Sequence, residues 1–392
     1  MSVMESEMHK KAEAWLTAHA QEIIDLTVGV CEVPAPPFGE QDRARHVCEL
    51  FANLGEAEVD SCGNAICIYQ EPQPGQSALV VSAHLDTVFP PGTDVRVKPG
   101  TGCKAGRLHA PGIGDNSVCV AIMVAVMKAL RAQGYCPPCG LAFAANVGEE
   151  GLGDLRGMKH LFDAGLASRW PLGAALVYDG DLGFLCNQGI ISRRLEIVYT
   201  GPGGHSWGDY GKPSALHAAG RAVATIDAIT VPTNPRTTFN VGVIEGGVSI
   251  NAIAAHTRLL VDMRSEDSAA LSQLEQQVRS AAQAALAGHT ELAVNISVVG
   301  DRPGGLLAPE HPYLQAMAAT LAAKNLEQRW TSASTDANVP LSRGIPAVTV
   351  GLTVGGRAHT LEEYVEESSI LPGAHHALVM LLTAVAYVNG VS

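Results

Sequence analysis

The sequence predicts an α/β protein whose mostly parallel sheet is interrupted by a second, smaller domain. In residues 1–188 helical patterns alternate with short apolar runs, which is typical of a parallel sheet covered by helices. Between residues 189 and 302 the order becomes β-α-β-β-α-β, which favours an antiparallel sheet with helices on one face. The α/β pattern resumes at residue 303. We therefore expect one domain over 1–188 and 303–392 and an inserted domain over 189–302.

The elements of the first domain follow from apolar runs and their period. A run at helical spacing predicts a helix, and a short apolar run between turn residues predicts a buried strand. The longest apolar run, 118–127, is stopped by Lys128 and is too short to span a bilayer, so it predicts a buried helix. Helices are expected over 41–54, 117–133 and 312–324, and strands over 65–69, 78–82, 141–147 and 347–352.

The inserted domain has a different pattern of polar and apolar residues. Its first strand alternates polar and apolar residues, as expected of a sheet with one buried face. We expect strands over 191–200, 237–244, 257–264 and 292–299, and helices over 214–229 and 268–287.

Composition excludes several classes of function. The chain has 392 residues, of which 47% are hydrophobic and 17% charged, which suits two well-packed globular domains. Its formal net charge of -13 argues against nucleic-acid and anionic-membrane partners, because both need a basic footprint. The amphipathic N-terminal segment has no apolar core of the signal-peptide type, which predicts a cytoplasmic protein. The nine cysteines, an odd number, favour free thiols, and the Cys136 to Cys139 segment is expected to be a plain loop.

The most informative segment is the end of the predicted strand over 78–82. His84 and Asp86 follow it, and because alternate residues of a strand point to one face, the two side chains emerge together. One is fit to hold a metal ion, and the other is fit to hold the histidine. This pair is half of a metal site, so the missing ligands are sought downstream.

Candidate partners occur at the ends of other apolar segments. Each has an ordinary alternative: a helix cap for the first, a surface pair for the adjacent glutamates, a turn for the second aspartate and a solvated ring for the histidine. Their coincidence at strand and helix ends favours a site. The candidates are Asp115, Glu149, Glu150, Asp179 and His359.

Imidazole and carboxylate without thiolate suit zinc, with manganese or cobalt as alternatives. Two histidines and three carboxylates are enough for two divalent cations that share one bridging carboxylate. Of the adjacent pair Glu149 and Glu150, one can bind metal while the other serves as a base. The set indicates a two-metal hydrolase.

These motifs resemble the two-zinc peptidase and aminoacylase family that includes peptidase T, carboxypeptidase G, acetylornithine deacetylase and succinyl-diaminopimelate desuccinylase. The resemblance runs from the His-x-Asp motif at His84 to His359 and includes the inserted domain, which in this family is a ferredoxin-like lid and dimerisation domain. It implies that His84 and Asp179 hold one metal, that Glu150 and His359 hold the other, and that Asp115 bridges them.

The resemblance also implies the remaining roles. Asp86 would orient His84, and Glu149 would be the general acid/base that acts on a water held between the metals. In the inserted domain, residues 203–206 resemble the family motif whose histidine, here His205, stabilises the oxyanion across a homodimer. Segments 249–251 and 262–264 resemble those that hold a substrate carboxylate. This assigns substrate binding to Asn251 and Arg264, which by themselves could be a turn residue and a surface charge.

Departures from the family pattern narrow the expected branch. Residues 116–119 differ from the usual sequence after the bridging aspartate, which alters the start of that helix. Asp at position 179, where deacylases and carboxypeptidases tend to have Glu, favours the peptidase T branch. Segments 334–338 and 344–347 favour it as well.

The expected activity is metal-dependent hydrolysis of an amide bond in a small carboxylate-bearing substrate, as a di- or tripeptide aminopeptidase. The alternatives are an N-acyl amino acid deacylase and an amidohydrolase or deaminase acting on a small amine or ureido compound. Two alternatives of another class are an inactive metal-binding scaffold, which would have lost a ligand or the base, and a two-metal phosphoesterase, which would carry more basic residues near the site.

Overall fold

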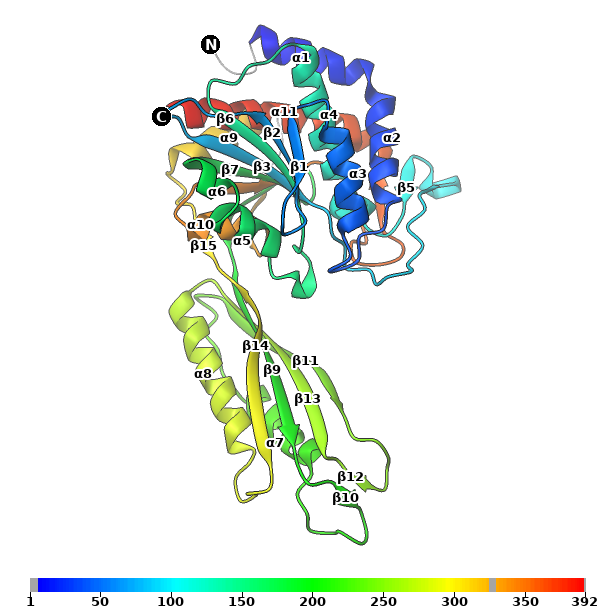
Figure 1. Ribbon diagram of the computed structural model, residues 1–392, viewed down its shortest axis with the longest axis vertical. Coiled ribbons are helices and arrows are strands. Elements are labelled where there is room, and N and C mark those ends of the chain that lie inside the picture. Colours follow the sequence, from blue (N-terminus) through cyan, green and yellow to red (C-terminus); the bar gives the residue numbers. More distant parts are fainter. Residues whose placement is uncertain (1–5, 324–328, 391–392) are drawn as a thin grey trace. The chain divides into compact units, whose positions relative to one another are not determined.

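The computed structural model describes residues 6–323 and 329–390, which belong to two compact units. The first unit is Met1–Gly189 with Gly305–Ser392, and the second is Ile190–Gly304, green to yellow in Figure 1. Each unit has a buried apolar cluster of its own. The two are therefore described separately.

A large sheet forms the centre of the first unit. Its order is β1-β2-β6-β3-β7-β17-β8-β15, with β16 beside β8. The central strands β6, β3, β7 and β17 run parallel to one another, while the strands outside them pair antiparallel except for β16 on β8. This confirms the α/β fold class. The strands are β1 Glu56–Val59, β2 Ala65–Gln70, β3 Ala78–His84, β6 Gly140–Asn146, β7 Leu172–Tyr178, β8 Phe184–Gly189, β15 Gly305–Leu306, β16 Arg329–Ala333 and β17 Ala347–Val350.

Helices cover this sheet (Figure 1). Two long apolar helices, α4 and α11, pack on each other and on β3 and β7. The segments Ile113–Ala132 and Glu367–Gly390 are long and apolar enough to cross a membrane, but 83% and 78% of their apolar windows are buried inside the fold, as in the core helices of globular proteins. The helices are α1 Glu7–Ala18, α2 Ala20–Cys31, α3 Gln41–Phe51, α4 Val118–Ala132, α5 Arg156–Asp163, α6 Leu166–Arg169, α9 Pro312–Ala323, α10 Asn338–Ser342 and α11 Glu367–Gly390.

A small second sheet in the same unit brings distant segments together. Its order is β18-β19-β5-β4, so the chain after residue 355 lies beside the chain before residue 110. Its strands are β4 Lys98–Pro99, β5 Arg107–His109, β18 Gly355–Gly356 and β19 Tyr364–Glu366. No pattern of apolar residues predicted these short strands.

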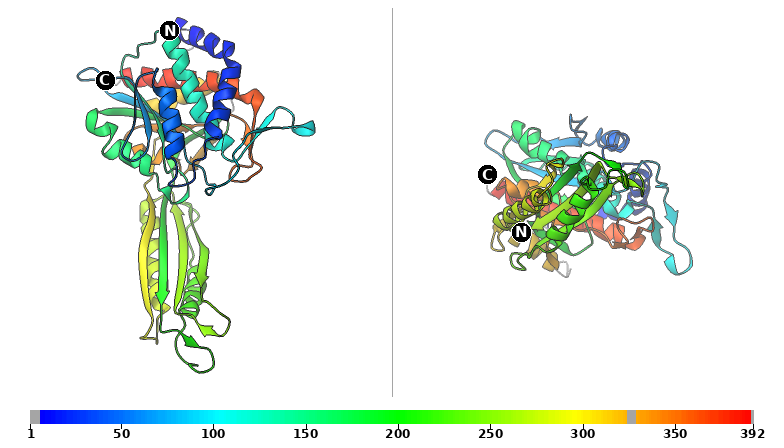
Figure 2. Two further views of the ribbon diagram at one scale, coloured as in Figure 1. Left: turned by 45° about the vertical axis from the view of Figure 1, so that its right-hand side comes forward. Right: turned by 90° about the horizontal axis from the view of Figure 1, so that it is seen from below.

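The second unit is the predicted β-α-β-β-α-β arrangement. Its antiparallel sheet has the order β11-β13-β9-β14, and α7 and α8 pack together on β9 and β13. Figure 2 shows both helices behind this sheet. A two-stranded ribbon of β10 and β12 is added at one end. The elements are β9 Ile191–Thr200, β10 Gly204–His205, α7 Ala215–Asp227, β11 Thr237–Gly246, β12 Ala252–Ile253, β13 His256–Ser265, α8 Ser268–Ala284 and β14 Ala293–Arg302.

The helices and strands expected from the sequence occur where they were placed, with ends that differ by a few residues. The strand that carries the His-x-Asp motif is longer than expected, because it continues through His84. The expected helix over 312–324 ends at Ala323, and Lys324 lies outside the described residues.

Candidate metal centre

Three neighbouring parallel strands deliver most of the candidate ligands. His84 is the last residue of β3, and its register partner on β6 is Asn146, three residues before Glu149. Asp179 directly follows β7, which pairs with β3 on its other side. Because parallel strands end at the same edge of a sheet, the side chains that follow them gather there.

Two loops complete the cluster. Asp115 lies in the irregular turn before α4, and His359 lies in the loop between β18 and β19. His359 and Arg357 have φ values of 66° and 60°, a left-handed conformation that residues other than glycine adopt rarely. Such backbone conformations are concentrated at functional sites, so the φ values favour a functional role for this loop.

Asp115 stands between the two histidines. Its Oδ1 lies 3.0 Å from Nε2 of His84, and its Oδ2 lies 3.1 Å from Nε2 of His359. The same His359 nitrogen is 3.0 Å from Oε1 of Glu150. One carboxylate therefore presents one oxygen to each imidazole, and the second imidazole also meets a second carboxylate.

The potential ligand atoms form three overlapping groups, each within 4.8 Å. One group contains His84, Asp115 and Asp179, and another contains Asp115, Glu150 and His359. The third contains His84, Glu149 and Glu150. The groups thus bring together the five residues proposed as metal ligands and Glu149. Asp115, which alone could have capped a helix, instead faces the histidines.

The orientation of His84 suits a metal ligand. Its Nδ1 lies 2.9 Å from the backbone carbonyl oxygen of Asp86, which can only accept, so Nδ1 carries the proton. In the neutral ring Nε2 then keeps a lone pair directed toward Asp115. This arrangement of donor and open nitrogen is the usual one for metal-ligating histidines.

The Asp86 carboxylate has a different partner from the one expected. Its oxygens accept hydrogen bonds from the backbone N–H groups of Glu149 and Glu150, at 3.0 and 2.7 Å. Its distance to Nδ1 of His84 is 3.8 Å, too long for a hydrogen bond. Asp86 thus holds His84 through its backbone carbonyl and holds the two glutamates through its buried carboxylate.

The pKa values reflect crowded negative charge. Burial, followed by repulsion from Asp115, raises the pKa of Asp179 to about 8. Hydrogen bonds with Asp115 and then Glu150 raise the pKa of His359 to about 10. Burial opposes ionisation of Asp115, but hydrogen bonds with His359 and His84 outweigh it and hold the pKa of that carboxyl below its usual value. In the metal-free cluster, bound protons therefore offset the negative charge that metal cations would balance.

The donor set fits two divalent metal ions. Three carboxylates and two imidazole nitrogens suit zinc, manganese or cobalt, and the two-sided position of Asp115 suits a bridge between two sites. No thiol stands in any of the three groups found among residues 6–323 and 329–390.

The remaining predicted site residues lie in the second unit and at its two ends. His205 and Asn251 are neighbours, because Ser206 N–H donates to the carbonyl oxygen of Asn251 at 2.9 Å. Both side chains are exposed. Arg264 is near the other end of β13, where its Nε donates to Asp262 at 2.8 Å. Within the second unit of a single chain, Arg264 and His205 therefore lie far apart.

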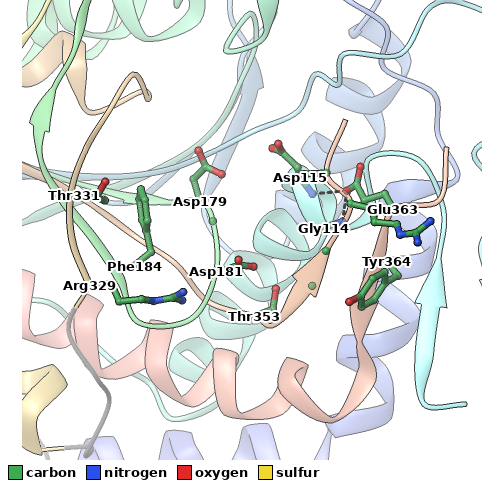
Figure 3. Close-up of a pocket in the computed structure, with 15 residues that line it drawn as sticks. Gly114, Asp115, Asp179, Asp181, Phe184, Arg329, Thr331, Thr353, Glu363 and Tyr364 are labelled. Carbon is green, nitrogen blue, oxygen red and sulfur yellow. Dashed lines mark hydrogen bonds between the residues drawn. The ribbon is translucent and has the colours of Figure 1, made fainter. Parts of the chain in front are cut away.

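Two buried charged residues that sequence reasoning missed support the cluster. The Glu363 carboxylate is 1% exposed and accepts from the N–H groups of Gly112, Gly114 and Asp115, at 3.0, 2.8 and 2.9 Å. Figure 3 shows Glu363 beside Gly114 and Asp115. The guanidinium of Arg43 is fully buried and donates to the carbonyl of Leu85, between His84 and Asp86, at 2.8 Å. Neither could be found from the sequence, because their partners are backbone groups that any residue type supplies.

Comparisons with known proteins agree with this geometry. The sequence model of "Peptidase family M20/M25/M40" matches residues 80–383, well over half of the chain. The uncharacterized protein YqjE of Bacillus subtilis is 25% identical over 315 residues, which are 77% of this chain and 79% of that protein.

Solved peptidase structures share the fold. The aminopeptidase PepT of Bacillus cereus is similar with a TM-score of 0.73 and 20% identity, over 94% of this chain and 99% of that one. A tripeptidase of Staphylococcus aureus has a TM-score of 0.76 and 19% identity over the same shares. YXEP of Bacillus subtilis, described as a dinuclear metal binding peptidase from the M20 family, has a TM-score of 0.65 and 15% identity, over 95% of this chain and 99% of that one. The chain therefore belongs to peptidase family M20/M25/M40, a family of metal-dependent peptide hydrolases.

Proposed function

We propose that this protein is a dinuclear metal aminopeptidase that acts on di- and tripeptides, with zinc as its first candidate metal and manganese or cobalt as alternatives. The observation that carries the proposal is the position of Asp115, whose two oxygens face Nε2 of His84 and Nε2 of His359. Its similarity in fold to an aminopeptidase and a tripeptidase supports the choice of substrate. We also propose that it works in the cytoplasm, without a membrane or nucleic-acid partner.

The groups of ligand atoms support a division into two sites. His84 and Asp179 share one group with Asp115, and Glu150 and His359 share another. We assign the first pair to one metal, the second pair to the other, and Asp115 to both. When bound, the two cations supply Lewis-acid polarisation of the scissile carbonyl and a lowered pKa for a water molecule.

Glu149 is the proposed general base and then acid. It is not needed in the five-ligand set, yet its carboxylate lies within 4.8 Å of ligand atoms of His84 and Glu150. Asp86 accepts hydrogen bonds from the backbone N–H groups of both Glu149 and Glu150, which supports a held base beside a metal-binding neighbour. Glu149 takes the proton of the attacking water and delivers it to the leaving amine.

The second unit is the proposed lid and dimerisation domain, with His205 and Asn251 acting on the oxyanion and substrate and Arg264 gripping a substrate carboxylate. From His256 to Arg264, β13 extends over about 27 Å at the usual rise of a strand. A small substrate cannot touch both ends of this sheet. We therefore propose a homodimer in which His205 and Asn251 come from one copy and Arg264 from the other.

Exposed apolar side chains near His205 support a second copy as the partner. Trp207 and Tyr210 follow His205 and are 88% and 91% exposed, and Val248 and Ile250 precede Asn251. Val248 and Ile250 are fully or almost fully exposed. Clusters of large apolar side chains in water mark surfaces that bind another protein.

The test is a hydrolysis screen with metal analysis of the same preparation. Tripeptides, dipeptides, N-acyl amino acids and ureido compounds are offered to the zinc, manganese and cobalt forms. We expect turnover of peptides with a free amino terminus. Turnover of N-acyl amino acids alone would favour the deacylase, turnover of ureido compounds alone would favour the amidohydrolase, and no turnover with both metals bound would favour an inactive scaffold.

Replacing the proposed base gives the sharper prediction. Glu149→Gln should lower kcat by about 10²- to 10⁴-fold, the usual contribution of general acid/base catalysis, while two metals per chain stay bound. Glu291→Gln, an exposed glutamate of the second unit, is the matched control and should keep full activity. Full activity of Glu149→Gln with both metals bound would refute the assignment.

A further inference from the structure

A cavity of about 550 Å³ opens beside the proposed metal centre within the first unit. Asp115 and Asp179 stand at one side of it, and its other walls come from the turn between β7 and β8, from β16, and from the loop before His359 (Figure 3). A cavity of this size accommodates a peptide residue and its side chain.

Four carboxylates line this cavity, and three of them already have a task. Asp115 and Asp179 are candidate metal ligands, and Glu363 accepts three backbone N–H groups. The fourth, Asp181, is exposed, and its carboxylate has no hydrogen bond or ion pair among the described residues. It also belongs to none of the three groups that could hold metal. A carboxylate beside the metal ligands is thus left for the substrate.

The backbone at Asp181 is held firmly although its side chain is open. Leu182 N–H donates to the carbonyl of Thr353 at 2.8 Å, and Phe184 N–H donates to the carbonyl of Asp181 at 2.9 Å. Arg329 holds the same turn, since its Nη2 donates to the carbonyl of Leu182 at 2.6 Å. A Cβ on Gly351 would lie 1.8 Å from the Asp181 carbonyl oxygen, so only glycine permits this approach. These contacts fix the direction from which Asp181 enters the cavity.

The wall next to Asp181 can receive a side chain. Phe184 and Arg329 are register partners on the parallel strands β8 and β16, and both line the cavity with Thr331. The Phe184 ring lies against Gly180, between Asp179 and Asp181, at ordinary van der Waals distance from where a Cβ would be. An apolar surface therefore adjoins the open carboxylate.

We propose that Asp181 binds the α-ammonium group of the amino-terminal residue of the peptide substrate and that Phe184 and Thr331 border its side chain. The inference rests on the proposed aminopeptidase function. The α-nitrogen of such a substrate is two bonds from the scissile carbonyl carbon, so its acceptor must lie beside the metal ligands. Asp181 is two residues beyond Asp179. A charge-assisted hydrogen bond from ammonium to carboxylate is strong enough to select free amino termini.

The experiment compares two substrates that differ only in the amino group: Leu-Gly-Gly and its analogue 4-methylpentanoyl-Gly-Gly. We expect the wild-type enzyme to prefer Leu-Gly-Gly. Asp181→Asn should lower kcat/KM for Leu-Gly-Gly by about 10- to 100-fold, chiefly through KM, and leave the analogue unchanged. If the analogue is not hydrolysed, inhibition constants are measured for the analogue and for leucinamide. Asp181→Asn should raise the inhibition constant of leucinamide, which has an amino group, and leave that of the analogue unchanged.

Two controls separate this role from general effects. Glu362→Gln removes an exposed negative charge four residues after Ala358 and outside the cavity wall, and it should retain the preference for Leu-Gly-Gly. Metal content of Asp181→Asn should equal that of the wild type.

The possible failures are distinguishable. If Asp181→Asn weakens both compounds equally, or if the wild type accepts both equally, the ammonium site is refuted while the peptidase stands. If the wild type hydrolyses no peptide and only N-acyl or ureido compounds, the proposed function fails and the ammonium site fails with it.

Discussion

At the scale of single residues, the candidate metal centre is a set of carboxylates and imidazoles that share protons. The two histidines lie against carboxylates, and the pKa of His359 is raised to about 10 while that of His84 is also raised, against its burial, by Asp115. In the metal-free protein the His359 ring is therefore protonated at neutral pH. Pairing of His359 stabilises the metal-free fold fully below its ordinary pKa of about 6.5, and this contribution is lost as the pH rises toward 10.

Metal binding should consequently release protons. A metal ion needs the neutral ring, so at pH 8 it displaces the proton of His359, and the apparent affinity should rise between pH 6.5 and 8.5. Isothermal titration of the metal-free protein with Zn²⁺ in buffers of different ionisation enthalpy measures the number released. We expect at least about one proton per chain, and fewer in His359→Ala. Heats that do not depend on the buffer would contradict this account.

Thiol chemistry gives a second prediction at this scale. Cys103 and Cys136 are exposed, whereas burial raises the pKa of Cys31 and Cys139 to about 11 and that of Cys67 to about 12. The thiolate is the reactive form, so buried thiols should be inert at pH 8. A thiol-reactive dye should label the two exposed cysteines first in the native protein and all nine after unfolding. Rapid labelling of Cys31 in the native protein would contradict the fold.

At the scale of elements, single buried side chains join segments that are distant in the sequence. Glu363 ties the loop before β19 to the turn that carries Asp115, so it positions a candidate ligand without touching metal. Glu363→Gln replaces one acceptor oxygen with an N–H₂ group that would face backbone N–H donors. It should weaken metal binding by about 10- to 100-fold, as changes behind metal ligands do, measured by chelator competition. Glu362→Gln should bind metal like the wild type, and equal affinity of the two variants would refute the positioning role.

Arg43 likewise joins distant segments, here around the His-x-Asp motif. From α3 it donates to the carbonyls of Cys31, Val33 and Leu85 at 3.0, 2.6 and 2.8 Å. Arg43→Met removes the donor from these three carbonyls, two of them in fully buried hydrogen bonds, and should lower the free energy of unfolding by about 3 kcal/mol or more. Arg45→Met, an exposed position on the same helix, is the matched control and should change it by less than about 1 kcal/mol. Denaturant unfolding measures both, and equal effects would contradict the prediction.

The same elements show what the sequence could and could not predict. The alternation in β9 predicted its bounds of Ile191–Thr200 without error, because one face of that strand is buried and the other is not. The short strands β5 and β19 had no pattern, since their pairing depends on two loops meeting. Side chains that bind each other, such as Asp115 and the histidines, have recognisable types. Side chains that bind backbone groups, such as Glu363, cannot be recognised by their residue type. Asp181 became a candidate only when the other three carboxylates of the cavity had been assigned a role.

At the scale of the whole molecule, metal binding and stability should be coupled in only one of the two units. All three groups that could hold metal belong to the first unit, and none lies in the second, which is described throughout. The chain leaves and re-enters the first unit at a single point, where Gly189 and Gly305 are register partners on β8 and β15. Each unit also has its own apolar cluster.

Calorimetry of the full chain should therefore show two unfolding transitions, of which only one responds to metal. Metal at 100 times its Kd stabilises the unit that binds it by about 2.7 kcal/mol, so a chelator should lower that transition by several degrees and leave the other in place. Leu274→Ala, which truncates a buried side chain of α8, should lower only the metal-independent transition, by about 2 to 5 kcal/mol of unfolding free energy. If both transitions moved together with chelator and with Leu274→Ala, the units would unfold as one body, and the second unit would contribute to the stability of the metal centre as well as to the proposed binding of substrate.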